Sequence, residues 1–317
     1  MTDLAPPLLA VVVPCYNEEE VLPSTAQVLA DKLAFLVDGG QVDGRSRVVF
    51  VDDGSTDATW EVIEKLHAAN PHLGGIKLSR NRGHQNALLA GLMTLRDRVD
   101  VTITLDADLQ DDVHAIDRML AAHREGAEIV YGVRDDRSSD TAFKRRTAHG
   151  FYALMTQLGA HTVEHHADYR LMSSRALREL AGFEEVNLFL RGLVPLLGFR
   201  TATVHYERSS RLAGQSKYPL RKMLGFAIDG ITSFSTRPLR AVGVLGAAVS
   251  TIALLVMVYA ILAKVTGHAV AGWTFTVVSV WFIGGVQMLA LGVVGEYVGK
   301  IYSETKRRPR FIVEHEI

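Results

Sequence analysis

The stretch Leu105-Asp106-Ala107-Asp108-Leu109-Gln110-Asp111-Asp112 decides the fold prediction, because an apolar run turns there into a cluster of acids. The run Val101–Leu105 is apolar and partly β-branched, and four carboxylates follow within seven residues. A buried strand that ends in polar residues is typical of parallel sheets, which bind ligands at the carboxyl ends of their strands. Asp106 and Asp108 are two residues apart, so in an extended segment their side chains point the same way.

Two carboxylates that face one cleft repel each other unless a cation lies between them, and such oxygen ligands suit Mg²⁺ or Mn²⁺. An ion held by only one or two carboxylates completes its shell with substrate phosphates. The alternative interpretation is an acidic, solvated loop that caps a helix starting near Asp112. The pair of acids alone does not separate the two interpretations.

The segments around this stretch alternate between strand-like and helix-like patterns. We predict strands at residues 8–13, 48–51, 76–78, 101–105 and 129–133, and helices at about 19–35, from 55 or 57 to 69, at 84–95 and after 112. This alternation predicts an α/β fold with a doubly wound, mostly parallel sheet. Each of the first four strands is followed by polar residues, which places one ligand site along the carboxyl edge of the sheet.

Several function classes are disfavoured by what the sequence lacks. No G-x-G-x-x-G follows the first strand and no G-x-x-x-x-G-K-[ST] occurs, which argues against a dinucleotide oxidoreductase and a P-loop NTPase. The net charge of −1 offers no basic field for a nucleic acid. The single cysteine, Cys15, excludes an internal disulfide, fits a reducing compartment, and is expected to be a packed thiol. We expect no signal peptide, since Leu8–Val13 is too short an apolar run.

Hydrophobicity is concentrated near the C-terminal end. Ala241–Ala263 is an uncharged stretch of 23 residues and Trp273–Val294 one of 22 residues, about 35 and 33 Å long as helices. Basic residues flank the pair: Arg221, Lys222, Arg237 and Arg240 before it, and Lys300, Lys306, Arg307, Arg308 and Arg310 after it. We therefore expect two transmembrane helices of a cytoplasmic (inner) membrane protein, with both termini and the catalytic domain in the cytoplasm.

The segment Tyr218–Thr236 has apolar residues three and four apart, which predicts an amphipathic helix lying in the membrane interface. The predicted domains are a cytoplasmic catalytic domain over 1–212, an acceptor loop and interfacial juxtamembrane helix over 213–238, two transmembrane helices over 239–299, and a cytoplasmic basic tail over 300–317. Small-residue pairs such as Gly243-x-x-x-Ala247 allow close helix packing, so we also expect a homo-oligomer formed through these helices.

Six motifs stand in the order seen in family-two glycosyltransferases of the GT-A fold. They are Pro14-Cys15-Tyr16-Asn17-Glu18, Val51-Asp52-Asp53-Gly54-Ser55-Thr56-Asp57, Ser79-Arg80-Asn81-x-Gly83, Asp106-Ala107-Asp108-Leu109-Gln110-Asp111, Asp168-Tyr169-Arg170-Leu171 and Arg211-Leu212-Ala213-Gly214-Gln215-Ser216-Lys217-Tyr218. Over roughly residues 8–300 the set resembles the polyprenyl-phosphate glycosyltransferases, which include dolichol-phosphate mannose synthases and bactoprenol glucosyltransferases. Several motifs in order are more specific than one, which favours the metal-site interpretation of the acidic stretch.

The resemblance implies a role for residues at the carboxyl edge in binding a nucleotide sugar. The implied donor-binding residues are Pro14, Tyr16, Glu18, Asp53, Arg80, Asp106 and Gln110, and the implied metal ligands are Asp106 and Asp108. Asp53 would contact the base or ribose, Tyr16 would offer a ring face, and Asp108, also catalytic, would bind the ion directly. The alternatives are core packing for Tyr16, a plain surface side chain for Gln110, and a solvated charge for Arg80.

The resemblance also implies an acceptor side. Asp168 matches the residue that looks like the catalytic base of the family. A phosphate monoester has a second pKa near 6, however, so the acceptor is already mostly ionised near neutral pH. Our hypothesis is that Asp168 positions the acceptor or the metal shell. Arg208, Arg211 and Lys217 would capture the acceptor phosphate, and the alternative is contact with anionic lipid head groups.

The expected activity is inverting transfer of a hexose, first glucose from UDP-glucose, to a polyprenyl phosphate such as undecaprenyl phosphate. The expected partners are the nucleotide sugar, the lipid phosphate and the membrane, with no nucleic acid. One alternative is a mannose synthase that uses GDP-mannose. A processive polysaccharide synthase is disfavoured because no Q-x-x-R-W occurs. An alternative from another class is a catalytically inactive membrane scaffold with the same fold.

Overall fold

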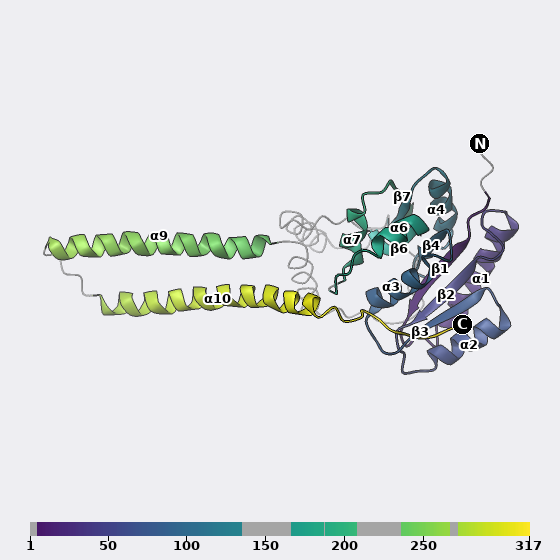
Figure 1. Ribbon diagram of the computed structural model, residues 1–317, viewed down its shortest axis with the longest axis horizontal. Coiled ribbons are helices and arrows are strands. Elements are labelled where there is room, and N and C mark those ends of the chain that lie inside the picture. Colours follow the sequence, from purple (N-terminus) through teal and green to yellow (C-terminus); the bar gives the residue numbers. More distant parts are fainter. Residues whose placement is uncertain (1–4, 135–165, 187, 208–235, 267–271) are drawn as a thin grey trace. The chain divides into compact units, whose positions relative to one another are not determined.

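The computed structural model describes residues 5–134, 166–186, 188–207, 236–266 and 272–317 (Figure 1). The chain divides into two compact units. The first contains residues 1–149, 162–217 and 307–317, and the second contains residues 150–161 and 218–306. The first unit has an α/β fold, and the second contains two long helices.

The described strands of the first unit form one eight-stranded sheet in the order β7-β5-β6-β4-β1-β2-β3-β8. The strands are β1 (Leu9–Cys15), β2 (Arg47–Asp52), β3 (Leu73–Leu78), β4 (Val101–Thr104), β5 (Ile129–Arg134), β6 (His166–Ser173), β7 (Thr201–Tyr206) and β8 (Val313–Glu316). β1 is parallel to β2 and β4, β2 to β3, and β5 to β7. β6 is antiparallel to β4 and β5, and β8 is antiparallel to β3. The predicted mostly parallel α/β sheet is confirmed, and the two antiparallel strands are additions to it.

The described helices of the first unit are α1 (Leu22–Asp38), α2 (Thr59–Ala69), α3 (His84–Leu95), α4 (Ala115–Arg124), α6 (Ser174–Leu180) and α7 (Leu190–Leu196). The four predicted helices correspond to α1 to α4, and α6 and α7 were not predicted. Every residue of β1 is buried, as expected of a strand in the middle of a covered sheet. α3 packs closely on β1, because a Cβ at Gly91 would lie 2.5 Å from Val12 Cγ1 and 2.8 Å from Val51 Cγ2.

The C-terminal end of the chain forms an edge strand of this sheet. The backbone N–H of Gly75 donates to Ile317 O (3.0 Å) and the N–H of Ile317 donates to Gly75 O (2.9 Å). Ser79 N donates to Ile312 O (3.0 Å), and Arg98 pairs with Glu316. The basic composition of residues 300–317 gave no signal for this strand, which ties residues 312–317 to β3.

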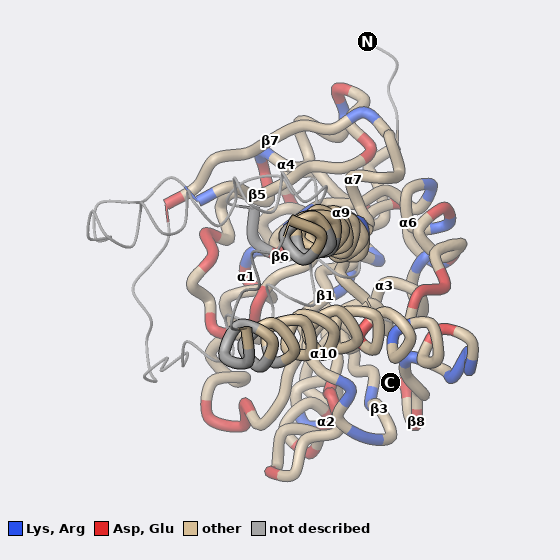
Figure 2. Tube along the Cα trace, turned by 90° about the vertical axis from the view of Figure 1, so that its left-hand side faces the viewer, with Lys and Arg blue, Asp and Glu red and all other residues tan. Residues whose placement is uncertain are grey.

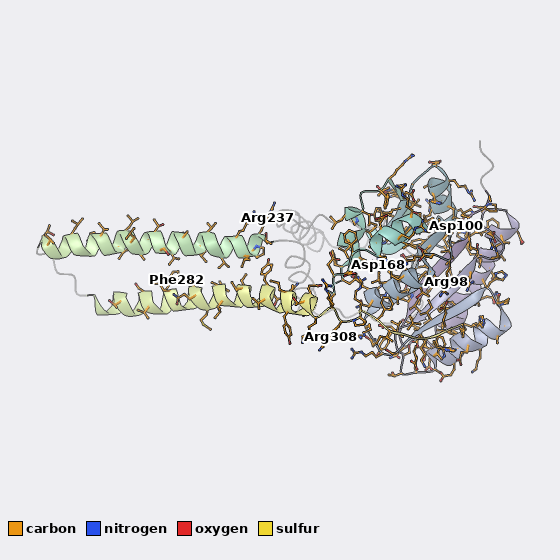
Figure 3. The ribbon with its side chains drawn as sticks, in the orientation of Figure 1. Arg98, Asp100, Asp168, Arg237, Phe282 and Arg308 are labelled. Carbon is orange, nitrogen blue, oxygen red and sulfur yellow. The ribbon has the colours of Figure 1, made fainter. Side chains whose placement is uncertain are left out.

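The second unit contains α9 (Arg237–Val265) and α10 (Trp273–Thr305), which lie side by side (Figures 1 and 2). Both helices are mostly tan in Figure 2, because they contain few Lys, Arg, Asp or Glu residues. Large apolar side chains project from them, such as Phe282, which is 64% exposed (Figure 3). Both are long and apolar enough to cross a membrane, by length and composition. The predicted spans Ala241–Ala263 and Trp273–Val294 lie within them. The predicted interfacial helix lies outside the described residues, apart from its last residue.

Candidate active site

The loops that follow β1 and β2 are joined to each other. Asn17 N donates to Ser55 Oγ (3.0 Å), and Asn17 Oδ1 accepts from Thr56 N (2.9 Å). Gly54, which directly precedes Ser55, has φ +65°, and a Cβ there would lie 2.5 Å from the carbonyl carbon of Arg80. Only glycine therefore fits, both for its backbone conformation and for the approach of the loop after β3. Three strand ends are thus brought together at the predicted carboxyl edge.

Asp53 holds the loop that leads into α3. Its side chain is buried, and its two carboxylate oxygens accept the backbone N–H groups of Arg82 (2.7 Å) and Gly83 (2.8 Å). Burial raises the pKa of Asp53, and the two backbone hydrogen bonds only partly offset that rise. The predicted contact with a base or ribose stays a prediction, and the structure adds an anchoring role that the sequence did not indicate. Arg80, in the same loop, is exposed.

The predicted donor-side residues on the first loop lie in different environments. Tyr16 is 44% exposed, so the core-packing alternative is wrong, and its ring is accessible to a ligand. Pro14 is buried, and Glu18 is half-buried with its backbone N–H donating to Thr59 Oγ1 (2.9 Å). Cys15 is buried, and its thiol donates to Val13 O (3.4 Å), so it is the packed thiol that we expected. Of these four residues, only Tyr16 is exposed.

The four acids after β4 divide into two kinds. Asp111 is buried and accepts hydrogen bonds from Tyr206 Oη (2.5 Å) and Arg134 Nη2 (3.1 Å). Asp112 accepts from His114 N (2.9 Å). These two acids fix the loop. Asp106 and Asp108 are the two acids of this stretch that are predicted as metal ligands.

Asp106 and Asp108 have partners that a cation can displace or share. Asp108 Oδ1 accepts from Gln110 N (3.2 Å), and Asp106 Oδ1 lies 3.6 Å from His84 Nε2. Burial raises the pKa of Asp106, and the charges of Asp111, Asp168 and Asp108 raise it further, against the opposing effect of His84. A carboxylate destabilised in its charged form by other carboxylates fits a site that gains a cation.

No group of three or more His, Cys, Asp or Glu side chains that could hold a metal occurs among the described residues. Mg²⁺ is usually bound by one or two carboxylates and completes its shell with water and substrate phosphates, so Asp106 and Asp108 fit such an ion. Gln110, beside them, is only 4% exposed, so the surface alternative is wrong. Its Nε2 has no hydrogen-bond partner among the described residues, so it can donate a hydrogen bond to a ligand.

Asp168, labelled in Figure 3, contacts two arginines and a histidine. Its Oδ1 accepts from Arg170 Nη2 (3.2 Å) and Arg191 Nε (3.2 Å), and its Oδ2 accepts from Arg191 Nη2 (3.1 Å). His84 Nε2 lies 3.6 Å from the same Oδ2. Burial alone would raise the pKa of Asp168, but His84, Arg191 and Arg170 together lower it far below the ordinary value of a carboxyl group.

His84 connects the two groups of acids. Its Nε2 is 3.6 Å from both Asp106 Oδ1 and Asp168 Oδ2, so Asp106, a predicted metal ligand, and Asp168 belong to one site. Burial would lower the pKa of His84, but Asp168 and Asp106 outweigh burial and raise it. Sequence reasoning missed His84 and Arg191. His84 directly follows the third motif, and Arg191 is the one charged residue within the apolar run 188–199.

The predicted acceptor-phosphate residues Arg208, Arg211 and Lys217 lie outside the described residues, so their roles stay predictions. The described part of the chain nevertheless brings together Asp106, Asp108, Gln110 and Asp168 from two strand ends. This arrangement can hold a divalent ion at one side and an anionic group beside the arginines at the other.

Comparison with known proteins shows the family of the chain. A family model described as "Glycosyl transferase family 2" matches residues 10–181. A Bacillus subtilis protein named "Uncharacterized glycosyltransferase YkoT" is 47% identical over 97% of this chain and 91% of its own length. The "Bactoprenol glucosyl transferase" of Shigella phage SfX is 37% identical over 96% of this chain and 98% of its own length. Glucosyl-3-phosphoglycerate synthase from Mycobacterium tuberculosis, a solved structure, is 19% identical over 72% of this chain and 79% of its own, with a TM-score of 0.46.

Proposed function

This chain belongs to glycosyl transferase family 2, and from that premise we propose that it transfers a hexose from a nucleotide sugar to the phosphate of a polyprenyl lipid. The observation that carries the proposal is the extent of the similarity to the phage bactoprenol glucosyl transferase. It covers 96% of this chain, and so includes the two apolar helices as well as the α/β unit. We further propose glucose from UDP-glucose as the sugar and undecaprenyl phosphate as the acceptor.

The donor would bind along the ends of β1, β2 and β4. Tyr16 offers an exposed ring for the base, and Gln110 offers a buried donor for the sugar or a phosphate oxygen. Asp106 and Asp108 would hold Mg²⁺ or Mn²⁺, and the ion would supply charge stabilisation for the departing diphosphate. Glu18, Asp53 and Arg80 stay in the proposed donor site, Asp53 also as the anchor of the loop that contains Arg80.

The acceptor would react by direct displacement with inversion. A phosphate oxygen of the lipid attacks the anomeric carbon, the bond from that carbon to the β-phosphate oxygen breaks, and the nucleoside diphosphate leaves. The attacking phosphate is mostly dianionic near neutral pH, so no protein base has to remove a proton. Asp168 is suited to positioning rather than proton transfer, because both its oxygens accept hydrogen bonds from arginine and its pKa is strongly lowered.

The two apolar helices support membrane association of the enzyme. We propose that they span the cytoplasmic membrane and that the catalytic unit lies on the cytoplasmic side, where nucleotide sugars are made. Arg208, Arg211 and Lys217 are proposed to bind the acceptor phosphate. A homo-oligomer through α9 and α10 is part of the same proposal.

The test is transfer by the purified full-length protein in detergent or nanodiscs. Labelled UDP-glucose and, separately, GDP-mannose are supplied with undecaprenyl phosphate, each with and without EDTA. A metal-dependent glucosyl lipid phosphate supports the proposal, and a mannosyl product supports the mannose synthase instead. A polymer, or no product with either donor, would contradict the proposal, and the latter would favour an inactive scaffold.

A further inference from the structure

Asp168 is the buried member of its ion pairs, and Arg191 is the exposed one. The side chain of Asp168 is 10% exposed, whereas that of Arg191 is 42% exposed. Arg191 donates from Nε and Nη2 to the two oxygens of Asp168, which fixes the plane of its guanidinium. A ligand that enters from solvent therefore meets the arginine before it meets the carboxylate.

The charge of Asp168 does not require Arg191 for its neutralisation. Arg170, with a side chain 2% exposed, already pairs with Asp168 from the buried side. One carboxylate thus pairs with two arginines, a buried one and an exposed one whose positive charge faces solvent. Such a charge, held on a planar fork, is suited to a phosphate group.

The position of Arg191 is fixed by its helix as well as by Asp168. Leu190 and Leu193 of α7 are buried, and Leu190 N donates to Gln85 Oε1 (3.1 Å) on α3. His84, the residue before Gln85, touches both Asp168 and Asp106. Arg191 Nη2 and His84 Nε2 thus approach the same oxygen of Asp168, Oδ2, and Arg191 is preorganised beside it.

We propose that Arg191 binds the phosphate of the acceptor and that Asp168, with Arg170 behind it, orients Arg191 for this purpose. This inference rests on the proposed function and adds to it a residue of the acceptor subsite. The diphosphate of the donor is the other phosphate in the reaction. Arg191 is assigned to the acceptor because it comes from α7, whereas the proposed donor residues lie at the ends of β1 to β4 and in the loops after them.

The test compares Arg191→Gln and Arg191→Lys with the unchanged full-length protein. The matched control is Arg178→Gln on α6, where an exposed arginine also faces an aspartate, Asp97, at 3.9 Å. Initial rates are measured with undecaprenyl phosphate varied at saturating UDP-glucose, and with the donor varied at saturating acceptor. Thermal unfolding of each variant checks that it is folded.

For Arg191→Gln we expect kcat/KM for the lipid phosphate to fall roughly 10- to 100-fold, the range for a lost hydrogen bond to a charged group. The KM for the donor should change less than about twofold, Arg191→Lys should recover part of the loss, and Arg178→Gln should behave as the parent. Unchanged acceptor kinetics in a folded Arg191→Gln protein, or a rise confined to the KM for the donor, would overturn this inference and leave the proposed function standing. If the unchanged protein transfers no sugar to polyprenyl phosphate, the proposed function fails, and this inference fails with it.

Discussion

Replacing Asp168 by Asn should destabilise the α/β unit strongly. The substitution keeps the size of the side chain but removes the charge that balances Arg170, whose side chain is 2% exposed. Breaking a buried ion pair by removing one partner costs about 3–5 kcal/mol, because the other charge stays buried without compensation. For a unit of this size that corresponds to a fall in Tm of roughly 6–20 °C.

Two further variants separate this cause from a general effect of mutation. Asp97→Asn removes an exposed carboxylate that pairs with Arg96 (3.0 Å), and it should change the stability by less than about 1 kcal/mol. The double variant Asp168→Asn with Arg170→Met removes both buried charges and should recover most of the lost stability. Thermal unfolding of the full-length protein in detergent, followed by intrinsic fluorescence at one scan rate, measures all three.

The same variants test the role of Asp168 in the reaction. Because the pKa of Asp168 is strongly lowered, we expect Asp168→Asn to stay impaired in transfer between pH 6 and pH 9. An Asp168→Asn protein that melts with the parent would refute the structural reasoning. Recovery of its activity at high pH would show that Asp168 acts as a proton acceptor.

Three other changes have defined outcomes. A carboxylate whose pKa is lowered on folding stabilises the protein above its ordinary pKa, and Asp168 also raises the pKa of His84, so the Tm difference between the parent and Asp168→Asn should widen as the pH falls from 8 to about 6 and narrow below about pH 4. Asp53→Ala leaves two backbone N–H groups without an acceptor, so it should cost about 2–4 kcal/mol in thermal unfolding and raise the donor KM; an unchanged Tm would contradict the anchoring role. Deletion of residues 312–317 uncovers the edge of β3 and should lower the Tm and promote aggregation in light scattering, whereas a monodisperse protein of parental Tm would show that β8 is dispensable.

The central strands were predictable from sequence, because β1, β2 and β4 are apolar runs that end abruptly in polar residues. β6 and β8 were not predicted. β6 contains the buried Arg170, which looks like a break in an apolar strand unless its partner Asp168 is known. β8 looks like a polar tail in the sequence, because β3, the strand it pairs with, lies about 240 positions earlier in the chain.

The site residues that directly follow strands could be predicted from the sequence. The contacts between residues that are distant in the sequence could not. Asp106, Asp108 and Asp168 came from motifs, and the structure brings them together through His84. Arg191 gave no signal because its significance depends on a contact with Asp168 made across 23 positions of the chain. The division of the acidic loop into anchoring and ligand-facing acids likewise depends on Tyr206, which lies on a strand that the sequence did not reveal.

The most direct test of the account is glucosyl transfer to undecaprenyl phosphate by Asp108→Ala, measured with Asp112→Asn as the matched control in the same loop. We predict that Asp108→Ala loses at least about 100-fold in rate, since a catalytic metal supplies several kcal/mol of stabilisation. EDTA should abolish transfer by the parent and added Mg²⁺ or Mn²⁺ should restore it, while Asp112→Asn should remain active. Parental rates from Asp108→Ala, or transfer that is indifferent to EDTA, would contradict a metal-assisted reaction at the end of β4.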